Sequence, residues 1–316
     1  MVNFTVITEF LLMEYSSIKK AQVIYAVLFL IIYLTALMGN LLTITAIATE
    51  PQLHSPMYFF LSNLSLLDVG FISVTLPKFI LNSLIGIRSI SLLGCMAQIF
   101  FFIFFGSTEI ALLIVMSYDR FVAICHPLHY GMTMTSARCI WATVGSWFSG
   151  FIYATIHTGN MFRLPFSGSN EIHQYFCDIP DVLKVASNEV LNTEFILIVA
   201  GSGFSLFCLA FLFVSYARIF SSVFKIPTVE GRYKALSTCA PQLIIFLLFL
   251  LSAIFSALKP PSDSTVQNLL VGMSYTIIPP FINPIIYSLR NQRIKIALRR
   301  MIKQIFLPKK RMSILE

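Results

Sequence analysis

Long apolar runs limit what this chain can fold into, because seven of them could each cross the roughly 30 Å hydrocarbon core of a bilayer. Of the 316 residues, 57% are hydrophobic and only 11% are charged, whereas a soluble chain carries about twice that share of charge. We therefore expect an all-α membrane protein, a bundle of seven transmembrane helices whose apolar surface faces lipid. The runs lie at about 23–48, 57–80, 93–125, 139–158, 195–222, 235–258 and 266–289.

Basic residues indicate the orientation. They concentrate in one set of connections and in the tail that begins at Arg290, and an excess of Lys and Arg marks the cytoplasmic side of a membrane. Residues 1–22 are then an extracellular N-terminus, 23–289 the bundle and 290–316 a cytoplasmic tail of a multi-pass plasma-membrane protein. Apolar and basic side chains alternate at helical spacing in residues 291–303, which predicts a short amphipathic helix on the lipids of the inner leaflet.

Several classes of protein fit this sequence poorly. The net charge is +8, but the basic residues form no stripe on a soluble domain, which argues against a nucleic-acid partner. No CxxC pair is present, so no zinc site is expected. We find no internal repeat of the kind that transporters carry, and no catalytic constellation that would make the chain an enzyme. A transporter or channel stays as an alternative.

Two covalent modifications are expected on the extracellular side, a glycan and a disulfide. Asn3 begins an Asn-Phe-Thr sequon in the N-terminal segment and is the predicted glycosylation site. Cys95 lies at the outer end of the third run, and Cys177 lies in the long connection 159–194, which we expect to be irregular. Because thiols oxidise outside the cell, we predict a disulfide between Cys95 and Cys177 that folds this connection over the mouth of the bundle.

The third run connects the two membrane surfaces, since Cys95 and Arg120 are separated by about 37 Å of helix. Steps of seven residues drift only about 20° around a helix, so Cys95, Phe102, Glu109 and Met116 share a face. The face carries a thiol, an aromatic ring and a carboxyl group above the Arg120 cation. This mixture indicates a face that points into the bundle.

Two acids lie deep in the membrane, Asp68 in the second run and Glu109 in the third. Each would cost several kcal/mol unless it were paired, hydrated or protonated. With Asn40 in the first run and Asn283 in the seventh, they predict a shared polar chamber. A sodium ion or a water cluster is the expected occupant, and a proton relay is the alternative.

Specific motifs now identify a family. Residues 119–121 (Asp-Arg-Phe), 283–287 (Asn-Pro-Ile-Ile-Tyr), 39–40 (Gly-Asn) and Asp68 resemble the rhodopsin-type (class A) G-protein-coupled receptors. Four longer stretches, which follow one another in order along the chain, resemble the vertebrate odorant (olfactory) receptors. These stretches are 53–68, 116–130, 234–241 and 280–291.

The resemblance implies a receptor that binds a small, volatile, mostly apolar odorant in the outer half of the bundle. It also implies coupling to a heterotrimeric G protein of the stimulatory olfactory type, which raises cyclic AMP. The residues implied for coupling and switching are Asp119, Arg120, Tyr216, Lys234 and Tyr287. Those implied for sodium are Asp68, Glu109 and Asn283. Those implied for the ligand are Phe102, Ile103, Gly106, Ser107, Ala200, Gly201, Phe204, Phe249, Ser252, Ile254, Phe255, Met273 and Thr276.

The chain departs from the family pattern at three places. Ser167 and Ser187 occupy the positions of two further cysteines, so we expect a looser lid over the mouth of the bundle. Gln242 replaces a common histidine, and residues 249–251 read Phe-Leu-Leu where Phe-Tyr-Gly is frequent, which favours a more apolar ligand. A chemosensory receptor of the same fold acting in another tissue is the alternative reading.

Overall fold

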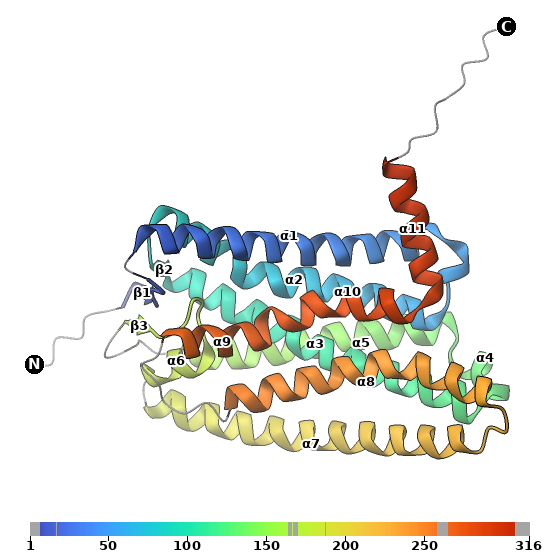
Figure 1. Cartoon of the computed structure of the whole chain (residues 1–316). Coiled ribbons are helices and arrows are strands. Elements are labelled where there is room, and N and C mark those ends of the chain that lie inside the picture. Colours follow the sequence, from blue (N-terminus) through green and yellow to red (C-terminus); the bar gives the residue numbers. More distant parts are fainter. Residues whose placement is uncertain are drawn as a thin grey trace, which may run out of the picture.

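The computed structural model describes residues 7–16, 18–163, 166, 170–186, 188–257 and 265–306, although not every side chain within them. Long helices lie side by side along one direction, with a small sheet at one end of the bundle (Figure 1). The long elements are α1 Lys19–Thr49, α2 Pro56–Ile85, α3 Leu92–Cys125, α5 Ser136–Met161, α7 Asn188–Phe224 and α8 Val229–Ala257, followed by α9 Thr265–Thr276, α10 Ile278–Arg290 and α11 Gln292–Phe306. The short elements are β1 Glu9–Leu12, β2 Ser89–Ser91, β3 Glu171–Ile172, α4 Tyr130–Thr133, α6 Ile179–Lys184 and 3-10 turns at Pro51–Leu53 and Pro127–His129.

Helices that could cross a membrane occur where the apolar runs predict them. Among the described residues, α1, α2, α3 and α5 are each long and apolar enough to span a bilayer. α9 and α10 pass the same test as a pair that bends by 44°. The bend lies at Ile277, directly before Pro279 and Pro280, which have no N–H for the helix ladder and whose rings clash with the preceding turn.

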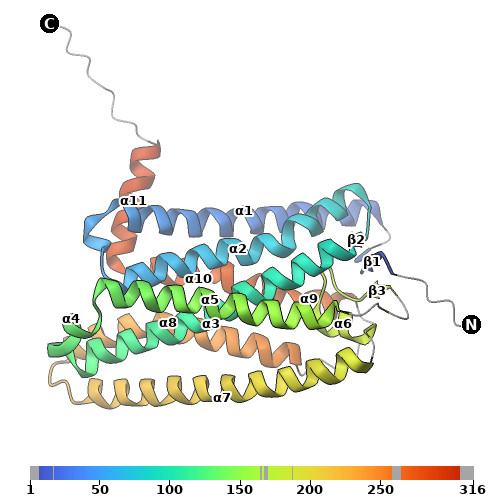
Figure 2. The same cartoon turned by 180° about the vertical axis from the view of Figure 1, so that it is seen from behind.

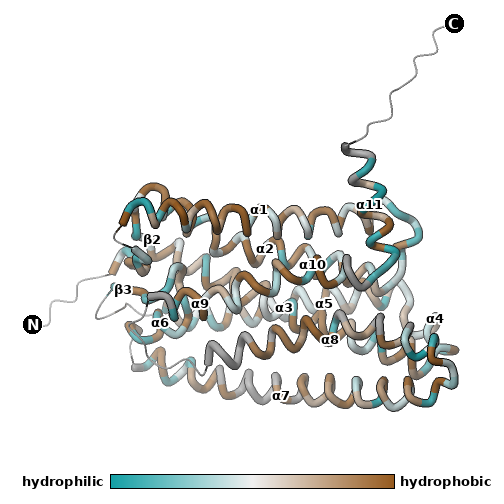
Figure 3. Tube along the Cα trace, viewed as in Figure 1, coloured by the Kyte–Doolittle hydropathy of each residue, from teal (hydrophilic) through white to brown (hydrophobic). Residues whose placement is uncertain are grey.

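The outer surface of the bundle is apolar, as a bundle in lipid requires. Figure 3 shows apolar residues along the length of the long helices and polar residues gathered at their ends. Large side chains such as Ile31, Phe148 and Trp141 are exposed on this surface, Trp141 with 73% of its area. Hydrophobic exposure on this scale would be a liability in water but is ordinary against acyl chains, so these faces contact lipid.

A three-stranded sheet closes one end of the bundle. β1 lies in the middle, antiparallel to β2 and parallel to β3. Phe10 of β1 is completely buried, and its ring packs edge-on against Phe166 with 5.3 Å between centroids. The prediction that the connection 159–194 is irregular is therefore wrong for β3 and for the helix α6. Strands this short carry too little period-2 pattern to be recognised from sequence.

α11 begins directly after α10 and crosses the direction of the long helices (Figures 1 and 2). Ile294 and Ala297 are buried against the end of the bundle. On its polar side Arg300 donates to both carboxylate oxygens of Glu50, at 2.8 and 3.0 Å. An amphipathic helix, as predicted for residues 291–303, therefore follows the last long helices, at the end of the bundle opposite the sheet.

Candidate functional site

Aromatic side chains gather beneath the sheet. The ring of Phe102 on α3 lies 4.9 Å from Phe71, 5.9 Å from Phe176 and 6.0 Å from Tyr275. Met273 packs against the same cluster from α9. Phe102 and Met273, which the sequence assigns to the ligand, thus lie together below the connection that carries Phe176.

One hydroxyl pair adds polarity to this apolar cluster. The hydroxyls of Tyr175 and Thr276 are hydrogen-bonded to each other, and both side chains are buried. Burial raises the pKa of Tyr175, so its phenol stays neutral at physiological pH. Thr276, also assigned to the ligand, therefore has a partner already and brings a hydroxyl to a mostly apolar cluster.

Other residues assigned to the ligand have different surroundings. Ile103 packs in a separate cluster with Cys95. Ser107 donates to the carbonyl of Ile103 at 2.6 Å and lies against Gly150 of α5, while Gly106 lies against the ring of Phe71. The remaining assignments fall outside the residues whose side chains the structure describes: Ala200, Gly201, Phe204, Phe249, Ser252, Ile254 and Phe255.

The connection above this cluster is attached to α3 at adjacent points. The predicted disulfide between Cys95 and Cys177 is present, with 5.5 Å between the two Cα atoms. Next to it, the Cys177 N–H donates to Gln98 Oε1 at 2.8 Å, and Gln98 Nε2 donates to the Val74 carbonyl of α2 at 3.0 Å. A covalent bond and a buried amide bridge thus hold the lid on α2 and α3. Ser167, Ser187 and Asn3 lie outside the described residues.

Midway along the bundle, the structure brings Asp68, Glu109 and Asn283 together. Asn283 Nδ2 lies 2.9 and 3.0 Å from the two oxygens of Asp68 and 3.3 Å from Glu109 Oε1. All three side chains are buried. Asn40 contributes differently, because its Nδ2 donates to the Pro280 carbonyl at 2.9 Å and so ties α1 to α10.

This chamber contains oxygens suited to a hard cation. In the described part of the chain, Glu109 Oε2 and Asn283 Oδ1 are buried and have no hydrogen-bond partner. Buried polar atoms are normally satisfied, so a further partner belongs here. Carboxylate and amide oxygens are the donors that hard cations prefer, and a sodium ion therefore fits the donor set, as water also would.

At the opposite end from the sheet, Asp119 is held from two sides. Arg120 Nε donates to Asp119 Oδ2 at 2.9 Å, and the Tyr130 hydroxyl donates to Oδ1 at 2.7 Å. Asp119 exposes 1% of its side chain and Arg120 exposes 12%. Burial and the nearby Asp119 charge raise the pKa of Tyr130, which keeps its hydroxyl protonated as the donor. Sequence reasoning missed Tyr130, although it ends the 116–130 motif.

Of the other residues assigned to switching, the structure describes the side chains of two. Tyr216 on α7 and Tyr287 on α10 are buried, and neither hydroxyl has a hydrogen-bond partner among the described residues. Gln242 Nε2 donates to the Leu113 carbonyl at 2.9 Å and so joins α8 to α3. The Lys234 side chain lies outside those that the structure describes.

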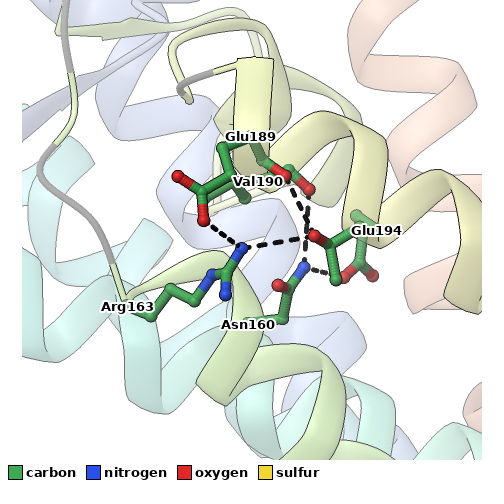
Figure 4. A network of polar contacts seen from close by, with 6 residues as sticks. Asn160, Arg163, Glu189, Val190 and Glu194 are labelled. Atoms are coloured by element: carbon green, nitrogen blue, oxygen red, sulfur yellow. Dashed lines mark hydrogen bonds and ion pairs between the residues drawn. The ribbon is translucent and has the colours of Figure 1, made fainter.

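Figure 4 shows a second polar network, between α5 and α7, that sequence reasoning missed. Asn160 Nδ2 donates to Glu194 Oε2 at 2.8 Å, and His157 Nδ1 is hydrogen-bonded to Glu194 Oε1. Nearer the surface, Arg163 pairs with Glu189 at 2.9 Å. The signal in the sequence was a histidine and an asparagine three residues apart, His157 and Asn160, near the end of α5. The network fastens α5 to α7 at the end of the bundle that carries the sheet.

Comparisons with known proteins agree with one another. The family model described as "Olfactory receptor" matches residues 29–305. Human olfactory receptor 14I1 is 52% identical over 307 residues, which cover 97% of this chain and 99% of the relative. Human olfactory receptor 14J1 is 47% identical over 315 residues, covering 99% and 98%. The crystal structure of squid rhodopsin has a similar fold, with a TM-score of 0.71 at 17% identity, covering 92% of this chain and 88% of that one.

Proposed function

Because the chain belongs to the olfactory receptor family of G-protein-coupled receptors, we propose that it detects a small, mostly apolar, volatile odorant and raises cyclic AMP through a stimulatory G protein of the olfactory type. Family membership makes the chain a multi-pass plasma-membrane receptor rather than an enzyme, with a small-molecule ligand and a heterotrimeric G protein as partners. What we propose beyond family membership is the chemical class of the odorant, the type of G protein and the cyclic AMP response.

The proposal includes seven spans and an extracellular N-terminus. α7 and α8 would complete the set of α1, α2, α3 and α5, with α9 and α10 forming one broken span. Residues 1–22 would then lie outside the cell, 23–289 would form the bundle and 290–316 would be cytoplasmic. Two observations support this orientation: the basic residues of the tail, and the disulfide at the sheet end, where an oxidising compartment is needed.

The observation that carries the ligand proposal is the aromatic cluster around Phe102 beneath the disulfide-anchored lid. Ligand sites are concave, mostly apolar and supplied with a few polar groups. The side chains of Phe102, Met273 and Phe176 are apolar, and Thr276, Tyr175 and Tyr275 add hydroxyls to the cluster. An odorant with one hydrogen-bonding group matches that composition.

An odorant panel with a cyclic AMP readout tests this site. Once an agonist is found, Phe102→Ala should raise its half-maximal concentration by about tenfold or more, because the cluster loses a large apolar contact. Phe148→Ala is the matched control, since Phe148 on α5 is exposed on the outer surface. Equal potency in both variants, at equal surface expression, would place the ligand elsewhere.

Arg120 is the proposed coupling residue. Asp119, which also accepts a hydrogen bond from Tyr130, would hold Arg120 in the idle receptor. The ligand must bind the active arrangement more tightly, because equal affinity for both states shifts nothing. Tyr216, Lys234 and Tyr287 would support the open cytoplasmic cleft. Arg120→Ala should keep surface expression and lose ligand-driven cyclic AMP. A normal response in that variant would show that Arg120 is not the coupling residue.

We also propose that Asp68, Glu109 and Asn283 hold a sodium ion in the idle receptor. The unpartnered Glu109 Oε2 and Asn283 Oδ1 supply donors for it, and a bound cation would offset the two neighbouring carboxyl groups. Asp68→Asn should weaken the dependence of basal signalling on sodium when choline replaces sodium at constant ionic strength. Identical titration curves for both proteins would contradict the sodium site and leave water as the occupant.

A further inference from the structure

A groove of about 600 Å³ lies between α2 and α3, close to the sheet. It is separate from the aromatic cluster beneath the lid. Ala97 and Phe101 of α3 line it and are exposed, so it lies on the outer surface of the bundle, where the chain meets lipid. Its volume lies within the range of roughly 300–1,000 Å³ that small-molecule sites occupy.

The walls of the groove come from matching helical faces. Val74 and Lys78 of α2 are four residues apart, and so are Ala97, Phe101 and Phe105 along α3. Side chains at this spacing lie above one another on one side of a helix. The two faces therefore form a channel parallel to the helices, with small or apolar side chains along most of its length.

Lys78 is the one charged residue that lines this groove. It lies seven residues before Ile85, the end of α2, and therefore about 10 Å below it. In the described part of the chain its ammonium has neither a hydrogen bond nor an ion pair, and no acid lines the groove beside it. A lysine that starts at that depth costs free energy unless its ammonium reaches the headgroups or meets an anion, and an anion in the groove would be that partner.

We propose that the groove binds a long-chain fatty acid from the surrounding leaflet, with its acyl chain along α2 and α3 and its carboxylate paired with Lys78. One acyl chain matches a single apolar channel, and one carboxylate matches a single cation. Lys78 is partly buried, so its stem lies along the groove while its ammonium stays near the headgroup level. This leaflet is the one at the sheet end of the bundle, and under the proposed orientation it is the outer leaflet.

A photoreactive palmitate that carries a diazirine in its chain tests the site. The full-length receptor is reconstituted in phosphatidylcholine nanodiscs and irradiated, and the labelled peptides are identified by mass spectrometry. We expect labelling of residues on the groove faces of α2 and α3. Unlabelled palmitate should compete for the site. Hexadecanol, which has the same chain without the charge, should compete about fivefold less well, because a partly exposed ion pair strengthens binding by about that factor.

Variants separate the charge from the shape of the groove. Lys78→Met should reduce labelling about fivefold, and Lys78→Arg should retain it. Lys225→Met removes one exposed lysine at the far end of α7 and should label like the unmodified receptor. Ala97→Phe fills the groove from an exposed position and should also block labelling. Binding of an odorant or a conformation-specific antibody confirms that each variant is folded.

Three results would overturn the proposal. One is labelling of the groove that is equal in the Lys78→Met variant and the unmodified receptor. Another is equal competition by palmitate and hexadecanol, which would mean that the groove recognises no carboxylate. The last is absence of groove labelling in the unmodified receptor, which would show that the diacyl lipid of the nanodisc occupies the groove instead.

Discussion

Replacing Tyr130 by Phe should make the receptor active without an odorant. The Tyr130 hydroxyl donates a 2.7 Å hydrogen bond to Asp119 Oδ1, while Arg120 occupies Oδ2. Tyr130→Phe removes one oxygen atom and leaves the ring in place. Asp119 then holds Arg120 with one fewer donor on its buried carboxylate, which weakens the idle arrangement but leaves the active one, where Arg120 is released, unchanged.

The size of the effect follows from the geometry. A hydrogen bond to a charged group contributes about 1.5–3 kcal/mol. Tyr130 is partly exposed, so water can replace some of the lost bond, and the lower value of about 1.5 kcal/mol applies. That value changes the ratio of idle to active receptor about tenfold. A receptor that is active about 1% of the time would become active about 10% of the time.

Basal cyclic AMP, measured without odorant and normalised to surface expression, reports this shift. Tyr118→Phe is the matched control, because Tyr118 lies next to Asp119 on α3, is exposed, and has no side-chain hydrogen bond among the described residues. The expected result is several-fold higher basal signal for Tyr130→Phe alone, with an unchanged maximal response. If both variants matched the unmodified receptor, Tyr130 would not hold the idle state.

Three further predictions concern stability. Asn283→Leu should lower the melting temperature of the purified receptor, because Asp68 and Glu109 lose their shared donor, a loss of about 2–3 kcal/mol. Cys177→Ser should cut surface expression and broaden the size-exclusion peak, since removing a disulfide between positions 82 residues apart costs about 2–5 kcal/mol. Phe10→Ala leaves a cavity at a fully buried position and should lower the free energy of unfolding by about 3 kcal/mol or more. It should speed amide exchange in β1 while exchange in α2 stays unchanged.

Features that depend on composition and long-period spacing could be predicted from the sequence. Apolar runs located the helices, and the positions of Cys95 at the end of the third run and of Cys177 in the long connection indicated their disulfide. The heptad spacing from Phe102 to Glu109 correctly indicated an inward-facing edge of α3, since Phe102 lies in the aromatic cluster and Glu109 in the polar chamber. The helices and the inward face of α3 were predictable because burial constrains many residues at a regular spacing. The disulfide was predictable because Cys95 had a single candidate partner in the extracellular connections.

Features that depend on a distant partner could not be predicted. Glu194 in α7 bonds His157 in α5, and a single acid in an apolar run does not indicate which helix it will meet. Ile103 and Ser107 lie on α3 near Phe102, yet they pack against neighbours outside the aromatic cluster. The helix period fixes the direction of each side chain relative to its own axis, whereas the neighbours depend on how the helices are rotated in the bundle.

The sheet imposes an order on how the receptor is made. β1 leaves the ribosome first, but its parallel partner begins at Glu171, opposite Leu11, 160 residues later (171 − 11 = 160). α1, α2, α3 and α5 must therefore be synthesised before β1 can complete its pairing. Until then Phe10 can pack against Ile90 of β2 but has no Phe166 to contact. An N-terminal tag joined directly to Glu9 would interfere with this last closing step, whereas one placed further upstream would leave the strand free to pair.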